Sequence, residues 1–175
     1  VIRPDSTITI TISVVGDLMC HSPQFEYAKV GKDSFDFTPT YRNVKKYLES
    51  SDFTFGNLET VTAGRKNGGF TGYPLFNTPS EYLDALKSVG FDLLVTANNH
   101  SIDRSEKGVL LTIDELVKRD INYVGTYNSQ TDRDSIRLYD IKGIKIAVLA
   151  YSYGTNGNVI PKGKDYLINL IDFNL

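Results

Sequence analysis

The sequence is short of the features that mark several classes of protein. It contains one cysteine, Cys20, so an intrachain disulfide is excluded. Its longest wholly apolar run, residues 146–150, is far too short to cross a membrane. Lys and Arg number 19 against 21 Asp and Glu, and no basic run is longer than two residues. The charge distribution therefore gives no support for nucleic acid as a partner.

What the sequence does contain is enough apolar material for one folded core. Hydrophobic residues make up 41% of the 175 residues, and a chain of this length most simply forms a single domain. No repeat, low-complexity tract or linker divides it. We therefore expect one α/β domain over residues 1–175, with an irregular tail from residue 154 to residue 175.

The most informative stretch is an apolar run that ends abruptly in polar side chains. Residues 93–97 read Leu-Leu-Val-Thr-Ala and carry no charge, which is typical of a strand buried on both faces. Asn98, Asn99 and His100 follow at once. In open parallel sheets, ligands bind where the strands end. We therefore expect a functional site at this strand end.

Two earlier predicted strands also end in acidic residues. Residues 9–15 alternate and then become apolar before Asp17, and residues 52–55 run into a turn that carries Glu59. Pro23 makes a helix improbable directly after the first strand, so residues 17–21 are predicted to be a loop.

Together these strand ends offer Asp17, Glu59 and Asn99 with His100, a ligand set suited to a divalent cation. Such an ion lowers the pKa of a bound water and polarises a phosphoryl or acyl oxygen. An imidazole beside it can bind the metal or protonate a leaving group. Hydrolysis is therefore the predicted reaction class. The basic side chains that could neutralise an anionic substrate are Arg65, Lys66 and Arg104.

Each of these residues also has an ordinary structural interpretation. Asp17 could shape a turn, and Glu59 could be a solvated charge. The Asn98-Asn99 pair could cap a helix, and His100 could be a buried structural histidine. Their joint placement at three strand ends favours the site.

Helices, one long loop and a hairpin are predicted around these strands. Helices are expected from the three-and-four spacing of apolar residues and from capping residues at 41–48, 78–90 and 109–119. The glycine-rich residues 60–77 indicate a long mobile loop over the site. A fourth strand is expected at residues 122–125, and a hairpin at residues 135–139 and 144–150.

Four motifs together resemble a known family. In chain order they are Gly16-Asp17-Leu18-Met19, Gly56-Asn57-Leu58-Glu59-Thr60, Phe76-Asn77-Thr78-Pro79, and Thr96-Ala97-Asn98-Asn99-His100 followed by Asp103 and Gly108. The set is similar to the bacterial capsule-synthesis CapA family, also called PgsA, which is associated with poly-gamma-glutamate capsule synthesis. That family belongs to the calcineurin-like metallophosphoesterase superfamily. The resemblance spans about residues 8–153.

The resemblance implies a layered α/β/α metallophosphatase-like sandwich. It also implies a domain outside the cytoplasmic membrane, at the cell surface or anchored to the membrane through a segment absent from this chain. The implied cofactor is a divalent metal, Mn, Fe or Zn. The implied substrate is an anionic polymer or a phosphoester, and the implied partner is a membrane synthase complex.

The resemblance also implies roles for individual residues of this sequence. Asp17 resembles the first metal-binding aspartate of the superfamily, and Glu59 stands in the place of the bridging carboxylate. Asn99 and His100 resemble the pair in which the amide binds metal and the imidazole contacts substrate.

The first motif departs from the catalytic pattern. In catalytic members a histidine stands two residues after the aspartate, whereas this chain has Met19 there. A thioether is a poor ligand for a hard cation. The nearest imidazole is His21, which we take as a second candidate catalytic residue.

The family is usually about twice as long and carries later histidine motifs, but this sequence has two histidines in all. We therefore expect the chain to be the N-terminal half of a longer protein, with a sandwich incomplete at its C-terminus. A two-sheet fold without half of its strands leaves an apolar face uncovered. Self-association, or association with the missing half, is the expected consequence.

Two functions remain open from the sequence. In the first, the full-length protein is a metal-dependent hydrolase with Asp17, Glu59 and Asn99 as ligands and His100 as general acid. In the second, it is a non-catalytic accessory protein that binds surface polymer or a membrane synthase. Met19 favours the second function, and the four polar residues at strand ends favour the first.

Overall fold

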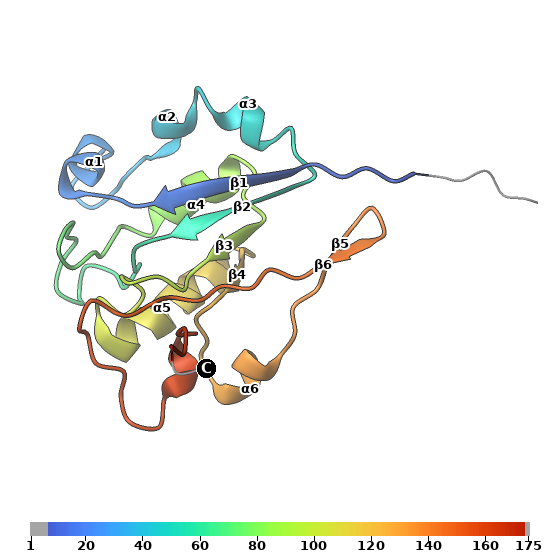
Figure 1. Ribbon diagram of the computed structural model, residues 1–175. Helices are drawn as coiled ribbons and strands as arrows, with labels where there is room; N and C mark the ends of the chain where they lie inside the picture. The colour runs from blue at the N-terminus through green and yellow to red at the C-terminus, as the bar shows by residue number, and fades with distance from the viewer. Residues whose placement is uncertain (1–6, 174–175) are drawn as a thin grey trace, which may run out of the picture.

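A parallel four-stranded sheet forms the centre of the fold (Figure 1). The computed structural model describes residues 7–173, so the ends of the predicted domain and tail, residues 1–6 and 174–175, lie outside the described residues. Neighbouring strands follow the order β1 (Ile12–Leu18), β2 (Phe53–Leu58), β3 (Leu93–Val95) and β4 (Asn122–Val124). Every neighbouring pair is parallel. All four carboxyl ends therefore lie at one edge, and the expected α/β fold is confirmed.

Helices cover one face of this sheet. In chain order the covering helices are α1 (Ser22–Tyr27), α2 (Thr38–Tyr41), α3 (Lys45–Leu48), α4 (Glu81–Ser88) and α5 (Ser105–Lys118). Helix α6 (Gln130–Asp134), which has no buried residue, and the 3-10 turn η1 (Asp165–Leu167) follow later in the chain. Helices α4 and α5 lie behind the sheet in Figure 1. Leu86 of α4 and Leu116 of α5 are fully buried in the same apolar cluster as Leu94 of β3. Burial of these side chains contributes about 1.5–3 kcal/mol each.

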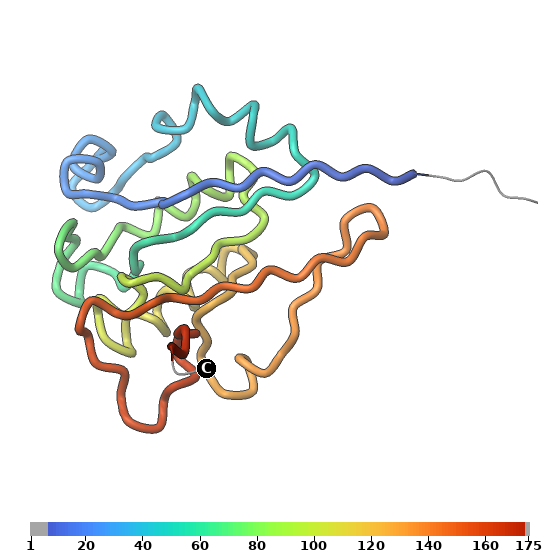
Figure 2. Tube along the Cα trace, viewed as in Figure 1, coloured from blue at the N-terminus to red at the C-terminus, as the bar shows by residue number. Residues whose placement is uncertain are grey.

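The other face of the sheet is covered by extended chain. The hairpin of β5 (Tyr139–Ile141) and β6 (Ile144–Ile146) is followed by a segment that runs back across the sheet toward the edge where the strands end (Figure 2). Phe53, Leu93 and Val124 pack on this side with Ile141 and Ile168. The chain after residue 154 is thus irregular for most of its length, yet it contributes to the core.

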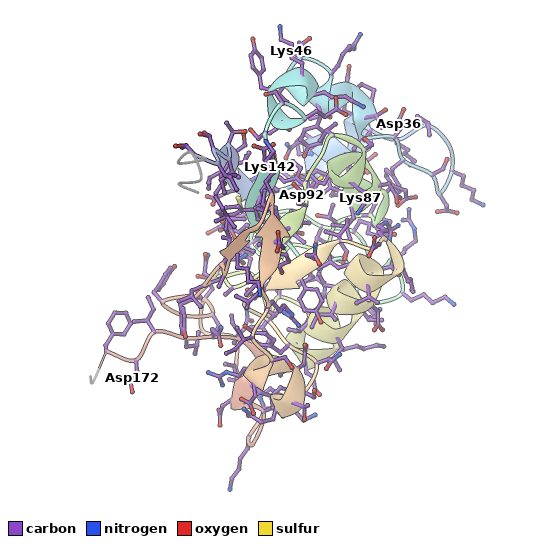
Figure 3. All side chains as sticks on the ribbon, turned by 90° about the vertical axis from the view of Figure 1, so that its right-hand side faces the viewer. Asp36, Lys46, Lys87, Asp92, Lys142 and Asp172 are labelled. Carbon is purple, nitrogen blue, oxygen red and sulfur yellow. The ribbon has the colours of Figure 1, made fainter. Side chains whose placement is uncertain are left out.

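The hairpin lies at the amino-terminal end of the strands. Figure 3 views the molecule from that side, with Lys142 and Asp92 labelled. Lys142 forms an ion pair with Asp52 in which Nζ and Oδ1 are 2.6 Å apart. Asp92 accepts a hydrogen bond of 2.8 Å from the backbone N–H of Thr54. The charged groups at this end therefore hold the hairpin and the strands together, while the carboxyl ends of the strands lie at the opposite end.

Two expectations about the first strand are wrong. Strand β1 continues through Asp17 to Leu18 instead of turning at residue 16, because the register shifts between Val15 and Asp17 and keeps the strand paired with β2. Helix α1 begins only four residues later, at Ser22. Pro23 stands in its first turn, where backbone N–H groups have no acceptor within the helix. Because proline lacks only such an N–H, it breaks no helical hydrogen bond there.

Two of the predicted helices differ in extent. The single helix expected at residues 41–48 is the pair of short helices α2 and α3. Helix α4 begins at Glu81, later than predicted, since the Thr78 hydroxyl is 2.7 Å from the Thr60 hydroxyl and does not cap the helix. Helix α6 was not predicted at all.

The loop predicted at residues 60–77 is irregular backbone, as expected, but it is firmly attached. The fully buried Asn77 side chain accepts from the N–H of Ala63 at 2.8 Å and donates to the carbonyls of Gly69 at 2.7 Å and Gly64 at 3.1 Å. Arg104 also donates to the Thr71 hydroxyl at 2.6 Å. These bonds fix the backbone that leads into residues 73–76 beside the site.

Apolar side chains stay exposed on β1 and on the segment after β6. Val14 is 67% exposed and Leu149 is 81% exposed. Isolated exposed apolar residues are ordinary, but an edge strand such as β1 with an apolar outer face favours association. The expected self-association or pairing with further chain therefore stays a prediction, and these residues are where that contact would form.

Candidate functional site

Two carboxylates converge at the carboxyl edge of the sheet. Asp17 lies near the end of β1, and Glu59 follows β2 directly. The side-chain amide of Asn57 donates to Asp17 Oδ1 at 2.9 Å and to Glu59 Oε2 at 3.1 Å. Because one NH2 group bridges both acids, their negative charges face a common point.

The surroundings disfavour a charged Glu59. Burial of this carboxyl raises its pKa first, and the negative charge of Asp17 raises it further, while His100 and Asn57 oppose the shift. Since the folded-state pKa lies above that of the unfolded chain, this group stabilises the fold below the unfolded pKa. That contribution is lost as the pH rises through the folded pKa. A cation bound between the two acids would remove this electrostatic cost.

Asn98 connects the end of β3 to the end of β2. Its Nδ2 donates to Asn57 Oδ1 and to the carbonyl of Leu58, both at 2.9 Å. Its Oδ1 accepts from the backbone N–H of His100 at 3.1 Å. Asn98 is therefore neither a helix cap nor a free ligand, and it positions both the bridging amide and the histidine.

His100 is paired with a buried carboxylate. Its side chain is nearly inaccessible, and its Nδ1 lies 2.8 Å from Oδ2 of Asp103, which also accepts from the N–H of Phe76 at 2.6 Å. Burial raises the pKa of Asp103, and the hydrogen bonds from Phe76 and His100 act in the opposite direction. A carboxylate acceptor at Nδ1 favours the proton on that nitrogen, which leaves Nε2 as the reactive one.

The ring of Phe76 contacts both histidines. Its centroid is 5.0 Å from that of His21 and 4.7 Å from that of His100, and both contacts are edge-to-face. Phe76 is fully buried, whereas His21 is exposed. The structure therefore brings the two predicted catalytic histidines into contact with the same aromatic ring.

Asn99, the third predicted metal ligand, lines a pocket together with His100. Within residues 7–173 its side chain makes no hydrogen bond, so its amide is free to bind a ligand.

Two of the basic residues expected near a substrate are engaged elsewhere. Arg65 pairs with Asp33 at 3.2 Å, and Arg104 binds the 60–77 loop.

The donors at this edge fit a hard cation better than a soft one. In the part of the chain that the structure describes, no three His, Cys, Asp or Glu side chains gather as a metal-binding group. The carboxylate ligands available there are Asp17 and Glu59, while Asn99, the third predicted ligand, lines a pocket whose lining includes neither acid. Oxygen ligands suit Mn²⁺, whereas Zn²⁺ prefers nitrogen and sulfur. Of the three metals expected from the sequence, Mn²⁺ fits this donor set best.

Sequence reasoning did not assign a role to three residues that organise the site. Asn57 and Asp103 stand inside the motifs quoted above, and Asp103 lies three residues after His100, close enough to meet it across a turn. Asn156 lies in the segment predicted to be an irregular tail, yet its Nδ2 is 3.4 Å from Nε2 of His100. No local pattern in the sequence signals that contact.

The family model described as "Bacterial capsule synthesis protein PGA_cap" matches residues 11–168. "Capsule biosynthesis protein CapA" of Bacillus anthracis is 30% identical over 146 residues, which cover 82% of this chain and 34% of that protein. "PGA biosynthesis protein CapA" of Bacillus subtilis is 26% identical over 153 residues, which cover 86% of this chain and 39% of that protein. The chain therefore spans somewhat more than a third of the length of these relatives.

Proposed function

The chain belongs to the bacterial capsule synthesis protein family, and we propose that its strand-end site is the centre of a metal-dependent hydrolase that acts in capsule biosynthesis. The observation that carries the proposal is the arrangement of Asp17 and Glu59 about one bridging amide, with the pair of His100 and Asp103 held to it through Asn98. A scaffold with no ligand gains nothing from two acids placed face to face beside a buried imidazole.

Each residue then has a distinct task. Asp17, Glu59 and the amide oxygen of Asn99 would hold a divalent ion, Mn²⁺ by preference. When bound, such an ion activates water and polarises a phosphoryl or acyl oxygen. Asp103 holds the His100 ring through Nδ1 and stabilises its positive form. His100 can then give a proton from Nε2 to a leaving group.

We propose a phosphoester, or the anionic polymer itself, as the substrate. The Bacillus subtilis relative is named for biosynthesis of PGA, which supports poly-gamma-glutamate as that polymer. The capsule named in the Bacillus anthracis relative supports action at the cell surface, and we propose a membrane synthase as partner. No helix within residues 7–173 is long and apolar enough to span a membrane.

A second candidate function has an observation in its favour. The position two residues after Asp17 is occupied by Met19, whose sulfur is a poor ligand for a hard ion. With Asp17 and Glu59 as the two carboxylate ligands among residues 7–173, the second candidate is a non-catalytic accessory that binds polymer or a synthase.

Hydrolysis of bis(4-nitrophenyl) phosphate, a chromogenic diester, separates the two functions. We expect turnover by the purified protein in the presence of Mn²⁺, and its loss in the Glu59→Gln variant, because the second carboxylate ligand is gone. Glu26→Gln is the matched control, since Glu26 is an exposed residue of α1. If the unmodified protein shows no turnover at saturating Mn²⁺, the hydrolase proposal is rejected and the accessory function is supported.

A further inference from the structure

The side-chain amide of Asn156 faces the reactive nitrogen of His100. Its Nδ2 lies 3.4 Å from Nε2, the nitrogen that the carboxylate of Asp103 leaves unused. Within residues 7–173 the Asn156 amide makes no other hydrogen bond. An oxygen atom about 2.9 Å from both nitrogens would fit between them, and hydrogen bonds of that length are usual. A ligand oxygen that binds to His100 is therefore also within reach of Asn156.

A tight turn over residues 155–158 holds this amide in place. The backbone N–H of Asn158 donates to the carbonyl of Thr155 at 2.9 Å, and Thr155 Oγ1 donates to the carbonyl of Asn158 at 2.7 Å. The side chain of Asn158 connects the turn to the site, since its Nδ2 lies 3.4 Å from Asp103 Oδ1. The same carboxylate therefore holds both the turn and the imidazole that the turn faces.

The backbone of the turn does not by itself require an asparagine at residue 156. Both central residues, Asn156 and Gly157, have a positive φ, +52° and +80°, and asparagine tolerates that conformation well. The turn between β5 and β6 has nearly the same φ angles, +53° and +86°, but its first central residue is Lys142. The turn therefore accepts other side chains at this position, and the amide of Asn156 calls for a separate explanation.

The amide and the imidazole line one pocket, which has room for part of a substrate. Its volume is about 450 Å³, and it is lined by Tyr73, Pro74, Leu75, Asn99, His100 and Asn156. None of these residues is Asp or Glu, so no carboxylate in the lining repels an anionic ester. The partly exposed side chains of Tyr73 and Leu75 offer apolar surface to the group that the ester carries. The pocket therefore suits the leaving group of a phosphoester.

We propose that Asn156 donates a hydrogen bond to the same substrate oxygen that receives a proton from His100. The inference rests on the proposed function, in which that oxygen belongs to the leaving group. In the reaction, water forms the new bond to phosphorus and releases a proton to solvent. The broken bond leaves its electron pair on the leaving oxygen, and His100 supplies the proton there. Asn156 keeps both of its N–H protons and stabilises the negative charge that develops on this oxygen.

Binding of inorganic phosphate, in which one oxygen takes the place of the leaving oxygen, tests the hydrogen bond without turnover. In calorimetric titrations with Mn²⁺ present, the dissociation constant should rise about tenfold in Asn156→Gly, because one donor to a charged oxygen is lost. Glycine adopts the same positive φ, so the turn is kept. Asn156→Asp should bind phosphate more weakly still, because a negative charge replaces the donor. Lys142→Gly, the same change in the matching turn between β5 and β6, should leave the dissociation constant unchanged.

The dependence of kcat on the leaving group distinguishes this contact from a purely structural role. Phenoxide is a poorer leaving group than 4-nitrophenoxide, so its departure depends more on a hydrogen bond to the leaving oxygen. The kcat of Asn156→Gly should therefore fall further with diphenyl phosphate than with bis(4-nitrophenyl) phosphate. Equal falls with the two diesters, or unchanged phosphate binding in Asn156→Gly, would overturn the inference. Phosphate binding that weakens in Asn156→Gly, without turnover of either diester by the unmodified protein, would support the contact and reject the hydrolase.

Discussion

The Asp103→Asn protein should hydrolyse a diester about 10²–10⁴-fold more slowly than the unmodified protein, with little change in KM. Asp103 contacts neither of the predicted carboxylate ligands but accepts from Nδ1 of His100. The substitution would leave the amide oxygen in the place of Oδ2, because that atom also accepts from the Phe76 N–H. It would also remove the charge that stabilises imidazolium, so His100 could no longer act as an effective acid.

The matched control is Asn158→Ala. Asn158 reaches the other oxygen of Asp103 at 3.4 Å, and its removal leaves the bond between Asp103 and His100 in place. We expect kcat within about threefold of the unmodified value for this variant, because a hydrogen bond as long as 3.4 Å contributes about 0.5 kcal/mol, the lower end of the usual range. An Asp103→Asn protein that is folded, binds Mn²⁺ and keeps its kcat would contradict the role given to His100.

The Gly125→Ala variant is expected to lose about 2–5 kcal/mol of folding free energy. Gly125 follows β4 with a φ of +109°, and a Cβ there would lie 2.5 Å from the Cβ and 2.7 Å from the backbone N of Ala97. The strain of a positive φ adds about 1–2 kcal/mol, and the forced contact adds about 1–3 kcal/mol. Ala97 immediately precedes Asn98, so the displacement should reach the site.

The Gly143→Ala variant separates the strain of a positive φ from the forced contact of an added Cβ. Gly143 has a φ of +86° in the turn between β5 and β6, but a Cβ there would meet no atom within 4 Å. Urea unfolding should show a loss of about 1–2 kcal/mol for this variant, from backbone strain alone. If the two variants lose equal free energy of unfolding, the close approach of Gly125 to Ala97 does not contribute to the destabilisation.

The sequence predicted the main strands because their patterns are local. Residues 93–95 form a buried strand, residues 122–124 form the fourth one, and Asn99 and His100 stand just beyond the third. The extents of the first strand and of α1 were mispredicted for equally physical reasons. A shift of register kept Asp17 in β1, and Pro23 was compatible with a first helical turn.

The connections within the site could not be predicted, since they depend on register and on distant chain. Asn57 bridges Asp17 and Glu59 only because β1 and β2 pair with Asp17 opposite Asn57. Asn156 reaches His100 from 56 residues away, through a segment without a regular pattern. Neither contact leaves a signal in hydrophobic periodicity or residue spacing.

Thermal unfolding with and without Mn²⁺, for the unmodified protein and for Glu59→Gln, tests most directly whether the two acids form a cation site. At about 100 times the dissociation constant, Mn²⁺ should raise the Tm of the unmodified protein by roughly 5–10 °C. The metal-free Glu59→Gln protein should have a Tm at or above that of the unmodified protein, because the buried charge beside Asp17 is gone, and Mn²⁺ should no longer raise it. An equal rise in both proteins, or none in the unmodified one, would contradict a metal site at Asp17 and Glu59.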